Sequence, residues 1–451
     1  MKILWLNAGL LLPLDKGGKL RTWHLMRQLA TRHDITYLSF SDPSQRDEHR
    51  TGMREVCRRL ETIPRTDPAK GTLHFYMDTA RYVVDPVPYA VAKYRSPAYA
   101  ARVRELLHPG TFDAVVCDFL PPVVNLPAAL PCPSILFTHN VEAEIWRRHA
   151  ETATNAIARH LLTRQWQRML RFERDALARF DLVLAVSEAD GDTFERLYPG
   201  ALRAPVHIVK TGVDTRYFAP LPEVPVRRAH IVFTGSMDWL PNEDGMVYFV
   251  REILPLIRRS EPQASLSIIG RSPTPAVRRL GEEAGIEVTG SVDDVRPHLA
   301  AGSVYVVPLR IGGGTRLKIF EAMGMAKAVV STSIGAEGLP VSHGTDIILA
   351  DEPDSFADAV VGLIRDADRR RGIEQAARRL VVEHYDWSAV AQGFENALTG
   401  LKGDSPLSQP VAVRGPQSAA RSRSKTMPSG PRAADNGPRT QQDDQEQVTV
   451  S

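Results

Sequence analysis

The sequence predicts an α/β fold of two doubly wound domains, in each of which helices cover both faces of a parallel sheet. Short apolar runs alternate with longer amphipathic stretches along nearly the whole chain. A strand buried on both faces reads as a continuous apolar run, and a helix reads as a 3.6-residue period, so this alternation is typical of parallel sheets with crossover helices. The proline-rich residues 218–225 interrupt the pattern near the middle of the chain, which predicts a linker between two domains.

The apolar runs give the expected strands in order. In the first half these are residues 2–6, 35–40, 114–117, 134–137, 182–186 and 207–209, with helices expected at 19–31 and 157–180 among others. In the second half they are residues 230–233, 265–269, 287–289, 304–307, 328–331 and 346–349. We therefore expect a first domain over residues 1–217, a linker over 218–228 and a second domain over 229–400, whose last helix could pack back on the first domain. Ligands of such sheets bind at the carboxyl ends of the strands, so the two domains would face each other across a cleft.

The last segment of the chain has a different composition. From residue 403 onward it contains no Phe, Trp or Tyr and is dense in Ser, Pro, Gln, Arg and Asp. It cannot bury enough apolar surface to offset the entropy of ordering, so residues 401–451 are predicted to form a disordered tail.

Composition and charge exclude several classes of protein. A formal net charge of +3 over 451 residues does not indicate a nucleic-acid binder, which would carry a basic domain or stripe. The three cysteines form no CxxC pair and no Cys/His ligand spacing, which argues against disulfide scaffolds and structural zinc and fits a reducing compartment. Asn7 and Gly9 break the apolar N-terminal run, which therefore reads as a buried strand rather than a signal peptide. No apolar stretch reaches the roughly 18 residues of a membrane span, and we expect a cytoplasmic protein.

The most informative stretch follows the expected strand at 304–307. A glycine loop leads into a helix, with Thr315 as its expected N-cap and Arg316 and Lys318 in its first turn. Cations at a helix N-terminus are unfavourable by about 0.3–1 kcal/mol each, unless an anion is bound there. The loop amides and both cations therefore predict a phosphate site. The loop glycines are Gly312, Gly313 and Gly314.

Glu321 lies one turn after Lys318 and can accept hydrogen bonds from a ribose. The simpler interpretation is a surface ion pair between Lys318 and Glu321, worth about 0.2–0.5 kcal/mol. That pair explains neither the three consecutive glycines nor Arg316, so the anion site is the preferred interpretation.

This stretch resembles the donor-binding segment of the family 4 glycosyltransferases. The resemblance rests on GGGTRLKIFEAMG at 312–324, AVVST at 328–332 and GAEGL at 335–339, and is greatest for the branch found in bacterial exopolysaccharide and other surface-glycan assembly. It implies a retaining, metal-independent enzyme of the GT-B fold, with two Rossmann-like domains, a nucleotide-sugar as co-substrate and no cofactor. It also implies that Glu321 holds the ribose, while Arg316 and Lys318 hold the diphosphate and stabilise the leaving group.

Further positions match the family outside this stretch. His139 ends the strand at 134–137 and resembles the histidine that contacts the transferred sugar, while Asn140 is expected to cap the next helix. The expected donor-binding glycines and serine elsewhere are Gly17, Gly18, Gly235, Gly290 and Ser291. A glycine pair after a first strand is common in any βα unit. It is not a G-x-G-x-x-G fingerprint, which counts against a dinucleotide oxidoreductase.

Two departures from the family pattern keep other functions open. The residues 236–242 contain neither the arginine nor the lysine that the family has there, and Gly313 stands where the family often has an acid that contacts the donor sugar. The alternatives are a non-hydrolysing sugar-nucleotide epimerase and a catalytically inactive nucleotide-sugar-binding subunit. Turnover to a free nucleoside diphosphate would separate a transferase from both.

The arginine-rich residues 157–180 admit two interpretations. A basic amphipathic helix can lie on an anionic membrane, and lipid-linked acceptors are common in the family. A core helix with one solvated face explains the same residues more simply. The expected partners are thus a nucleotide-diphosphate-sugar donor and a glycan or lipid-linked acceptor, with peripheral contact at the inner face of the cell membrane as an open alternative.

Overall fold

The computed structural model describes residues 1–14, 17–66, 72, 85–153, 155–311 and 317–401. The predicted disordered tail, from residue 402 onward, lies outside the described residues, as do five predicted site residues, Gly312, Gly313, Gly314, Thr315 and Arg316.

The first half of the chain forms a sheet of seven parallel strands in the order β3-β2-β1-β4-β5-β6-β7. Its strands are β1 (Lys2–Leu6), β2 (Asp34–Ser41), β3 (Arg59–Pro64), β4 (Ala114–Asp118), β5 (Ser134–Phe137), β6 (Leu182–Ala185) and β7 (His207–Ile208). Its helices are α1 (Gly17–Leu29), α2 (Asp47–Gly52), η1 (Met53–Glu55), α4 (Tyr89–Ala92), α5 (Pro97–Leu106), η2 (Pro121–Asn125), α6 (Glu142–Thr152), α7 (Ala156–Leu177) and α8 (Glu188–Leu197).

The second half forms a sheet of six parallel strands in the order β10-β9-β8-β11-β12-β13, which repeats the winding of the first sheet. Its strands are β8 (His230–Thr234), β9 (Ser265–Ile269), β10 (Ile286–Gly290), β11 (Val304–Val307), β12 (Val329–Ser331) and β13 (Ile348–Leu349). Its helices are α9 (Leu240–Tyr248), η3 (Phe249–Ile253), α10 (Leu254–Ser260), α11 (Pro275–Leu280), α12 (Arg296–Ala301), α13 (Leu317–Gly324), α14 (Pro353–Arg365), α15 (Ala367–His384) and α16 (Trp387–Gly400). The predicted fold class is confirmed.

Each sheet is buried on both faces, as its apolar strands require. In β1, Trp5 packs into one apolar cluster with α1 and α16, and Leu6 packs into another with α5. In β8, Phe233 packs with η3 and α14, while Val232 packs with α12 and α13.

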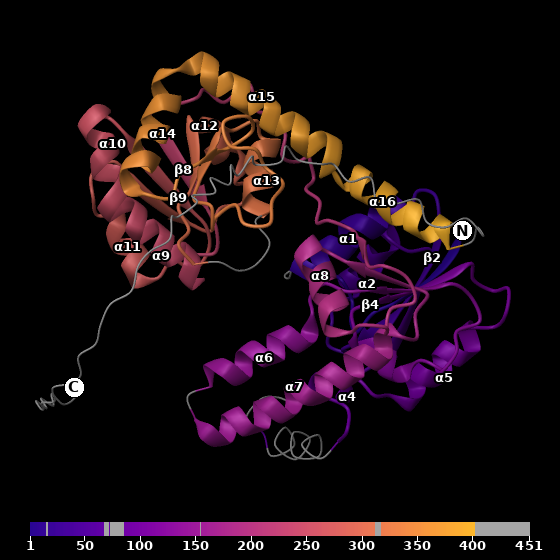
Figure 1. Ribbon diagram of the computed structural model, residues 1–451. Coiled ribbons are helices and arrows are strands. Elements are labelled where there is room, and N and C mark those ends of the chain that lie inside the picture. The colour runs from indigo at the N-terminus through magenta and orange to yellow at the C-terminus, as the bar shows by residue number, and fades with distance from the viewer. Residues whose placement is uncertain (15–16, 67–71, 73–84, 154, 312–316, 402–451) are drawn as a thin grey trace, which may run out of the picture. The chain divides into compact units, whose positions relative to one another are not determined.

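The last helix, α16, lies against α1 of the first half (Figure 1). Phe394 packs on Trp5, with ring centroids 5.5 Å apart, and Trp387 stacks on His24 at 5.3 Å. The chain thus returns to the first sheet after completing the second.

Helices α6 and α7 pack together as a hairpin beside the first sheet (Figure 1). The N-terminus of α6 differs from the prediction that Asn140 caps it. The helix begins at Glu142, and its first two backbone N–H groups donate to the carboxylate of Glu173 on α7, at 2.9 Å from Glu142 and 3.2 Å from Ala143. A buried acid from the neighbouring helix satisfies these amides, and sequence proximity could not reveal it.

Candidate functional site

The strand orders place a topological switch point in each sheet. Neighbouring strands β1 and β4 have connections that leave in opposite directions, and so do β8 and β11. In doubly wound sheets, ligands bind in the crevice outside the carboxyl ends of the strands at such points. Most of the described site residues that the sequence predicts lie at or beside these two points.

At the second switch point, the structure brings Lys318 to the end of β8. A Cβ atom added to Gly235 would lie 2.7 Å from Asn242 Nδ2 and 2.9 Å from Lys318 Nζ, so a side chain at this position would require both groups to shift. Lys318 Nζ donates to Asn242 Oδ1 at 2.6 Å and lies 4.3 Å from the centre of the Phe233 ring. The buried Asn242, at the start of α9, was not predicted as a site residue. It lies within residues 236–242, where the family that the sequence resembles has an arginine and a lysine.

Glu321 follows Lys318 by one turn of α13 and is half-buried. Burial raises the pKa of Glu321 to about 7, and the nearby Lys318 opposes this shift. A half-buried carboxylate beside an ammonium can accept hydrogen bonds from hydroxyl groups, as the predicted ribose contact requires.

Glycines end three adjacent strands of the second sheet. Gly290 has a φ of +70°, and its carbonyl accepts a hydrogen bond of 3.1 Å from Gly270 N–H. Gly270 has a φ of +152°, and a Cβ atom there would lie 1.7 Å from the carbonyl oxygen of Gly235. The predicted Gly235 and Gly290 are therefore linked through Gly270, which the sequence analysis missed. The predicted Ser291 follows Gly290 and is exposed.

At the first switch point, the carboxylate of Asp118 is the centre of a buried polar network. Its Oδ2 accepts hydrogen bonds from Trp5 Nε1 at 3.0 Å, Asn7 Nδ2 at 2.7 Å and Thr22 Oγ1 at 2.8 Å. Its Oδ1 lies 2.7 Å from His139 Nε2. Asp118 is fully buried, so these four partners replace the water that the charge loses.

His139 is held between Asp118 and Arg21. Its Nδ1 lies 2.7 Å from Arg21 Nη1, and Arg21 Nε donates to Thr211 Oγ1 at 2.8 Å. An arginine can only donate, so Nδ1 is the acceptor and Nε2–H donates to Asp118. The imidazole is therefore neutral. In agreement, burial lowers the pKa of His139, an effect that Asp118 opposes and Arg21 reinforces.

Both ring nitrogens of His139 are thus bonded to protein side chains. The predicted contact of this residue with the transferred sugar stays a prediction, and in this geometry the ring nitrogens are already engaged. One face of the ring is also covered, because Phe119 stacks on it with centroids 3.8 Å apart.

Phe119 also explains one of the two predicted glycines after β1. A Cβ atom on Gly18 would lie 2.6 Å from the Phe119 ring, whereas a Cβ atom on Gly17 would meet nothing within 4 Å. Gly18 therefore admits an aromatic ring that packs on His139, and its predicted contact with the donor remains a prediction. The φ of Phe119 is +68°, a left-handed conformation uncommon for a residue with a side chain.

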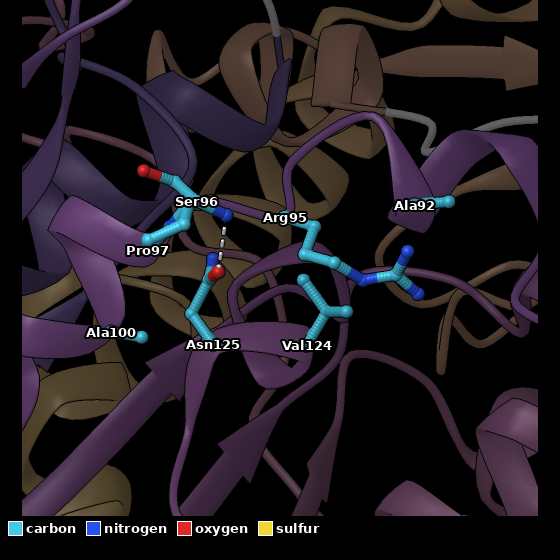
Figure 2. Close-up of a pocket in the computed structure, with 7 residues that line it drawn as sticks. All are labelled: Ala92, Arg95, Ser96, Pro97, Ala100, Val124 and Asn125. Atoms are coloured by element: carbon cyan, nitrogen blue, oxygen red, sulfur yellow. Dashed lines mark hydrogen bonds between the residues drawn. The ribbon is translucent and has the colours of Figure 1, made fainter.

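A cavity of about 410 Å³ lies apart from these predicted residues, between α4, α5 and η2. Figure 2 shows Ser96 and Asn125 in its wall, joined by a bond of 2.8 Å from Ser96 N–H to Asn125 Oδ1. Asn125 Nδ2 donates to Tyr94 O, and Arg95 is paired with Asp85 at 2.7 Å. These polar groups already have protein partners, and none is a predicted catalytic residue, so the switch points are the better candidate site.

Among the residues that the structure describes, no group of three or more His, Cys, Asp or Glu side chains is arranged to hold a metal ion. Of the helices described there, none combines the length and the apolar character that crossing a bilayer requires.

Comparisons with known proteins agree with this architecture. The sequence profile of the family described as Glycosyltransferase Family 4 matches residues 16–217, and that of Glycosyl transferases group 1 matches residues 228–366. An uncharacterised 44.6 kDa protein from the cps region of Klebsiella pneumoniae is 20% identical, over 85% of this chain and 96% of that protein. A GDP-mannose-dependent alpha-(1-6)-phosphatidylinositol monomannoside mannosyltransferase of Mycobacterium tuberculosis is 27% identical, over 51% of this chain and 66% of that protein.

Solved structures share the fold at low sequence identity. HepE of Anabaena in complex with UDP superposes with a TM-score of 0.61 at 15% identity, over 89% of this chain and all of that chain (100%). WaaG, a glycosyltransferase involved in lipopolysaccharide biosynthesis, gives a TM-score of 0.55 at 14% identity, over 88% of this chain and 100% of that chain.

Proposed function

Because the chain belongs to the glycosyltransferases of family 4 type with the GT-B fold, we propose that it transfers a sugar with retention from a nucleotide-diphosphate-sugar to a glycan or lipid-linked acceptor. The observation that carries the proposal is the cluster at the end of β8, where Lys318 meets Gly235 and Asn242 beside the half-buried Glu321. A lysine ammonium next to a glycine, where no side chain covers the backbone, can bind a diphosphate. The carboxylate of Glu321 can accept hydrogen bonds from the hydroxyl groups of a ribose.

Each donor group has a proposed partner. Lys318, together with Arg316, holds the diphosphate, and Glu321 accepts hydrogen bonds from the ribose hydroxyls. Gly290 and Ser291 lie around the nucleobase. The glycine loop of residues 312–315 contributes backbone amides, and Gly17 and Gly18 let the chain approach the donor from the first domain.

In the proposed reaction, the bond between the anomeric carbon and the diphosphate oxygen breaks, and a bond to the acceptor oxygen forms on the same face of the sugar. The acceptor's hydroxyl proton passes to the departing diphosphate. Lys318 and Arg316 stabilise the charge that develops on the leaving group, which is commonly the largest catalytic contribution. Because Asp118 and Arg21 occupy both ring nitrogens of His139, its proposed contribution to orienting the sugar is contact through the neutral ring, not action as a general base. These cations take the place of a metal ion, so EDTA should leave the rate of transfer unchanged.

The acceptor is proposed to belong to surface-glycan assembly. The similarity to a protein of the cps region, which extends over most of both chains, supports this assignment. Lipid-linked acceptors would bring the enzyme to a membrane, and we propose that it works at the inner face of the cell membrane. The exposed apolar side chains on the α6–α7 hairpin support contact with that surface.

A thermal-shift screen against UDP, GDP, ADP and TDP tests the donor site. A ligand at about a hundred times its dissociation constant should stabilise the wild type by roughly 2.7 kcal/mol. We expect one diphosphate to do so, and Lys318→Met, which keeps most of the apolar stem, to lose most of the shift. Lys93→Met, which changes a lysine of the first domain next to α4, is the matched control and should keep the full shift. The absence of any shift in the wild type would contradict the proposal.

Product analysis with the matching nucleotide-sugar separates transfer from the two alternatives. Release of the free nucleoside diphosphate with a glycosylated acceptor supports a transferase, and NMR of the new linkage reports whether configuration is retained. An altered sugar still attached to its nucleotide would identify an epimerase. Binding without any change would identify an inactive subunit.

A further inference from the structure

The loops after β8 and β9 form a single backbone unit at the second switch point. Gly235 N–H donates to Ile269 O at 3.0 Å, and Met237 N–H donates to Arg271 O at 2.9 Å. Between these two bonds, Gly270 touches the carbonyl of Gly235 so closely that no side chain fits there. The residue after Gly270 is therefore fixed in position relative to the end of β8.

That residue, Arg271, brings a second cation to the cluster. Its side chain is exposed, and its Nε donates to Ser236 Oγ at 2.9 Å. Ser236 Oγ in turn donates to Asp238, which is also exposed. A guanidinium carries five N–H donors in a planar fork. The bond to Ser236 orients this fork and uses one of its donors.

Arg271 and Lys318 are connected through two intervening residues. Lys318 Nζ donates to Asn242 Oδ1 at 2.6 Å, and Asn242 Nδ2 donates to Ser236 O at 2.8 Å. Asn242 is only 2% exposed, so water does not compete for the hydrogen bonds of its amide. Two cations thus approach the end of β8 from opposite sides, Lys318 from α13 and Arg271 from the loop after β9.

An anion bound at the end of β8 would be attracted by both cations. A diphosphate has oxygens on two phosphorus atoms, and arginine binds such oxygens in a bidentate manner. We propose that Arg271 is a second diphosphate-binding residue of the donor site and holds the donor from the β9 side. This inference rests on the proposed function, because it assigns a further contact to the same ligand.

The test measures binding of the diphosphate that stabilises the wild type, and of the nucleoside with the same base, by isothermal titration. Arg271→Ala should weaken diphosphate binding at least tenfold, and Arg271→Lys should recover part of the loss. Binding of the nucleoside should stay within twofold, because it carries no phosphate. Arg278→Ala, which removes an exposed arginine from α11, should behave like the wild type.

Three results would overturn the inference, and they are distinguishable. Equal diphosphate affinity of Arg271→Ala and the wild type removes Arg271 from the site but leaves the proposed function intact. Equal loss of diphosphate and nucleoside shows that the substitution disturbs the fold of the site. If the wild type binds none of the four diphosphates, the proposed function itself fails.

Discussion

Asp118 accepts hydrogen bonds from four side chains through both oxygens of its carboxylate. Oδ2 accepts from three donors and Oδ1 accepts from His139, so replacing either oxygen by an NH₂ group would disrupt the network. In Asp118→Asn, the amide oxygen can replace only one carboxylate oxygen. Its NH₂ group would then face another donor, because His139 cannot turn its Nδ1 away from Arg21.

We expect Asp118→Asn to lower the free energy of unfolding by about 3 kcal/mol, the range for losing charged hydrogen bonds in a buried site. Urea denaturation measures the change. Asp175→Asn alters an exposed carboxylate paired with Arg174 and should change stability by less than about 0.5 kcal/mol. Equal stability of the two variants would contradict the network.

The sequence suggested individual site residues without their partners. Lys318 was predicted from its place in the first turn of a helix after a glycine loop, and Gly235 and Gly290 were predicted from the resemblance to the family. Asp118 lies 111 residues from Asn7 and 96 from Thr22, and Asn242 lies 76 from Lys318. Nothing in the local pattern of an aspartate after a strand tells which distant donors will surround it.

At the scale of the element, the ionisable side chain of Glu173 on α7 caps the N-terminus of α6. It is 1% exposed, accepts the first two amides of α6, and also accepts a hydrogen bond of 2.5 Å from the Tyr198 hydroxyl. Burial raises the pKa of Glu173 from 4.5 to about 7, an effect that these donors oppose and the nearby Glu142 reinforces. The folded protein therefore keeps a proton on Glu173 at pH values where the unfolded chain has lost it.

This difference predicts how stability varies with pH. Between pH 4.5 and 7 only the folded state binds the proton, so the contribution of Glu173 to stability falls as the pH rises. Because Glu173→Gln lacks this titration, its stability relative to the wild type should rise by about 3 kcal/mol from pH 4 to pH 8. Urea denaturation at several pH values measures it. Tyr198→Phe keeps the titrating carboxylate but removes a donor that lowers its pKa, so its stability should fall with rising pH at least as steeply as that of the wild type. Parallel profiles for Glu173→Gln and the wild type would contradict the assignment.

The buried strands were the elements that the sequence predicted most closely. Residues 2–6, 134–137, 265–269 and 304–307 coincide with β1, β5, β9 and β11. The strand β3 was missed because it lies at the edge of its sheet. Half of its sequence, RLETIP, is polar, and all of its residues are either half-buried or exposed. An edge strand with one partner need not be continuously apolar, so it lacks the signal by which its neighbours were recognised.

At the scale of the whole molecule, both sheets have the same winding, with the first strand of each domain in the middle and later strands added outward on either side. The alternation of strands and helices predicts parallel sheets, but the order of strands depends on which buried faces fit together. The same holds for α16. Its apolar residues predict a buried face, and only the structure identifies Trp5 and Trp23 as members of the cluster that covers it.

The α6–α7 hairpin carries the most exposed large apolar side chain among the described residues. Ile157 is 73% exposed and Leu161 is 42% exposed, and together with the exposed Arg164 they have the spacing of one helix face. An exposed apolar face flanked by arginines suits an anionic bilayer, into which the apolar groups insert while the cations contact the headgroups. Exposed arginines are well hydrated and do not by themselves indicate a partner. The argument for a membrane contact therefore rests on the two exposed apolar residues.

Sedimentation with vesicles tests this contact. The wild type should bind vesicles of phosphatidylglycerol and phosphatidylcholine, and bind less at high salt. The double variant Ile157→Asp, Leu161→Asp should lose at least tenfold in affinity, since each side chain contributes about 1–2 kcal/mol when it leaves water. Val382→Asp changes a similarly exposed residue on α15 and should bind as the wild type does. If the double variant binds like the wild type, or the wild type does not bind, then the hairpin face is simply solvated and the proposed membrane contact is wrong.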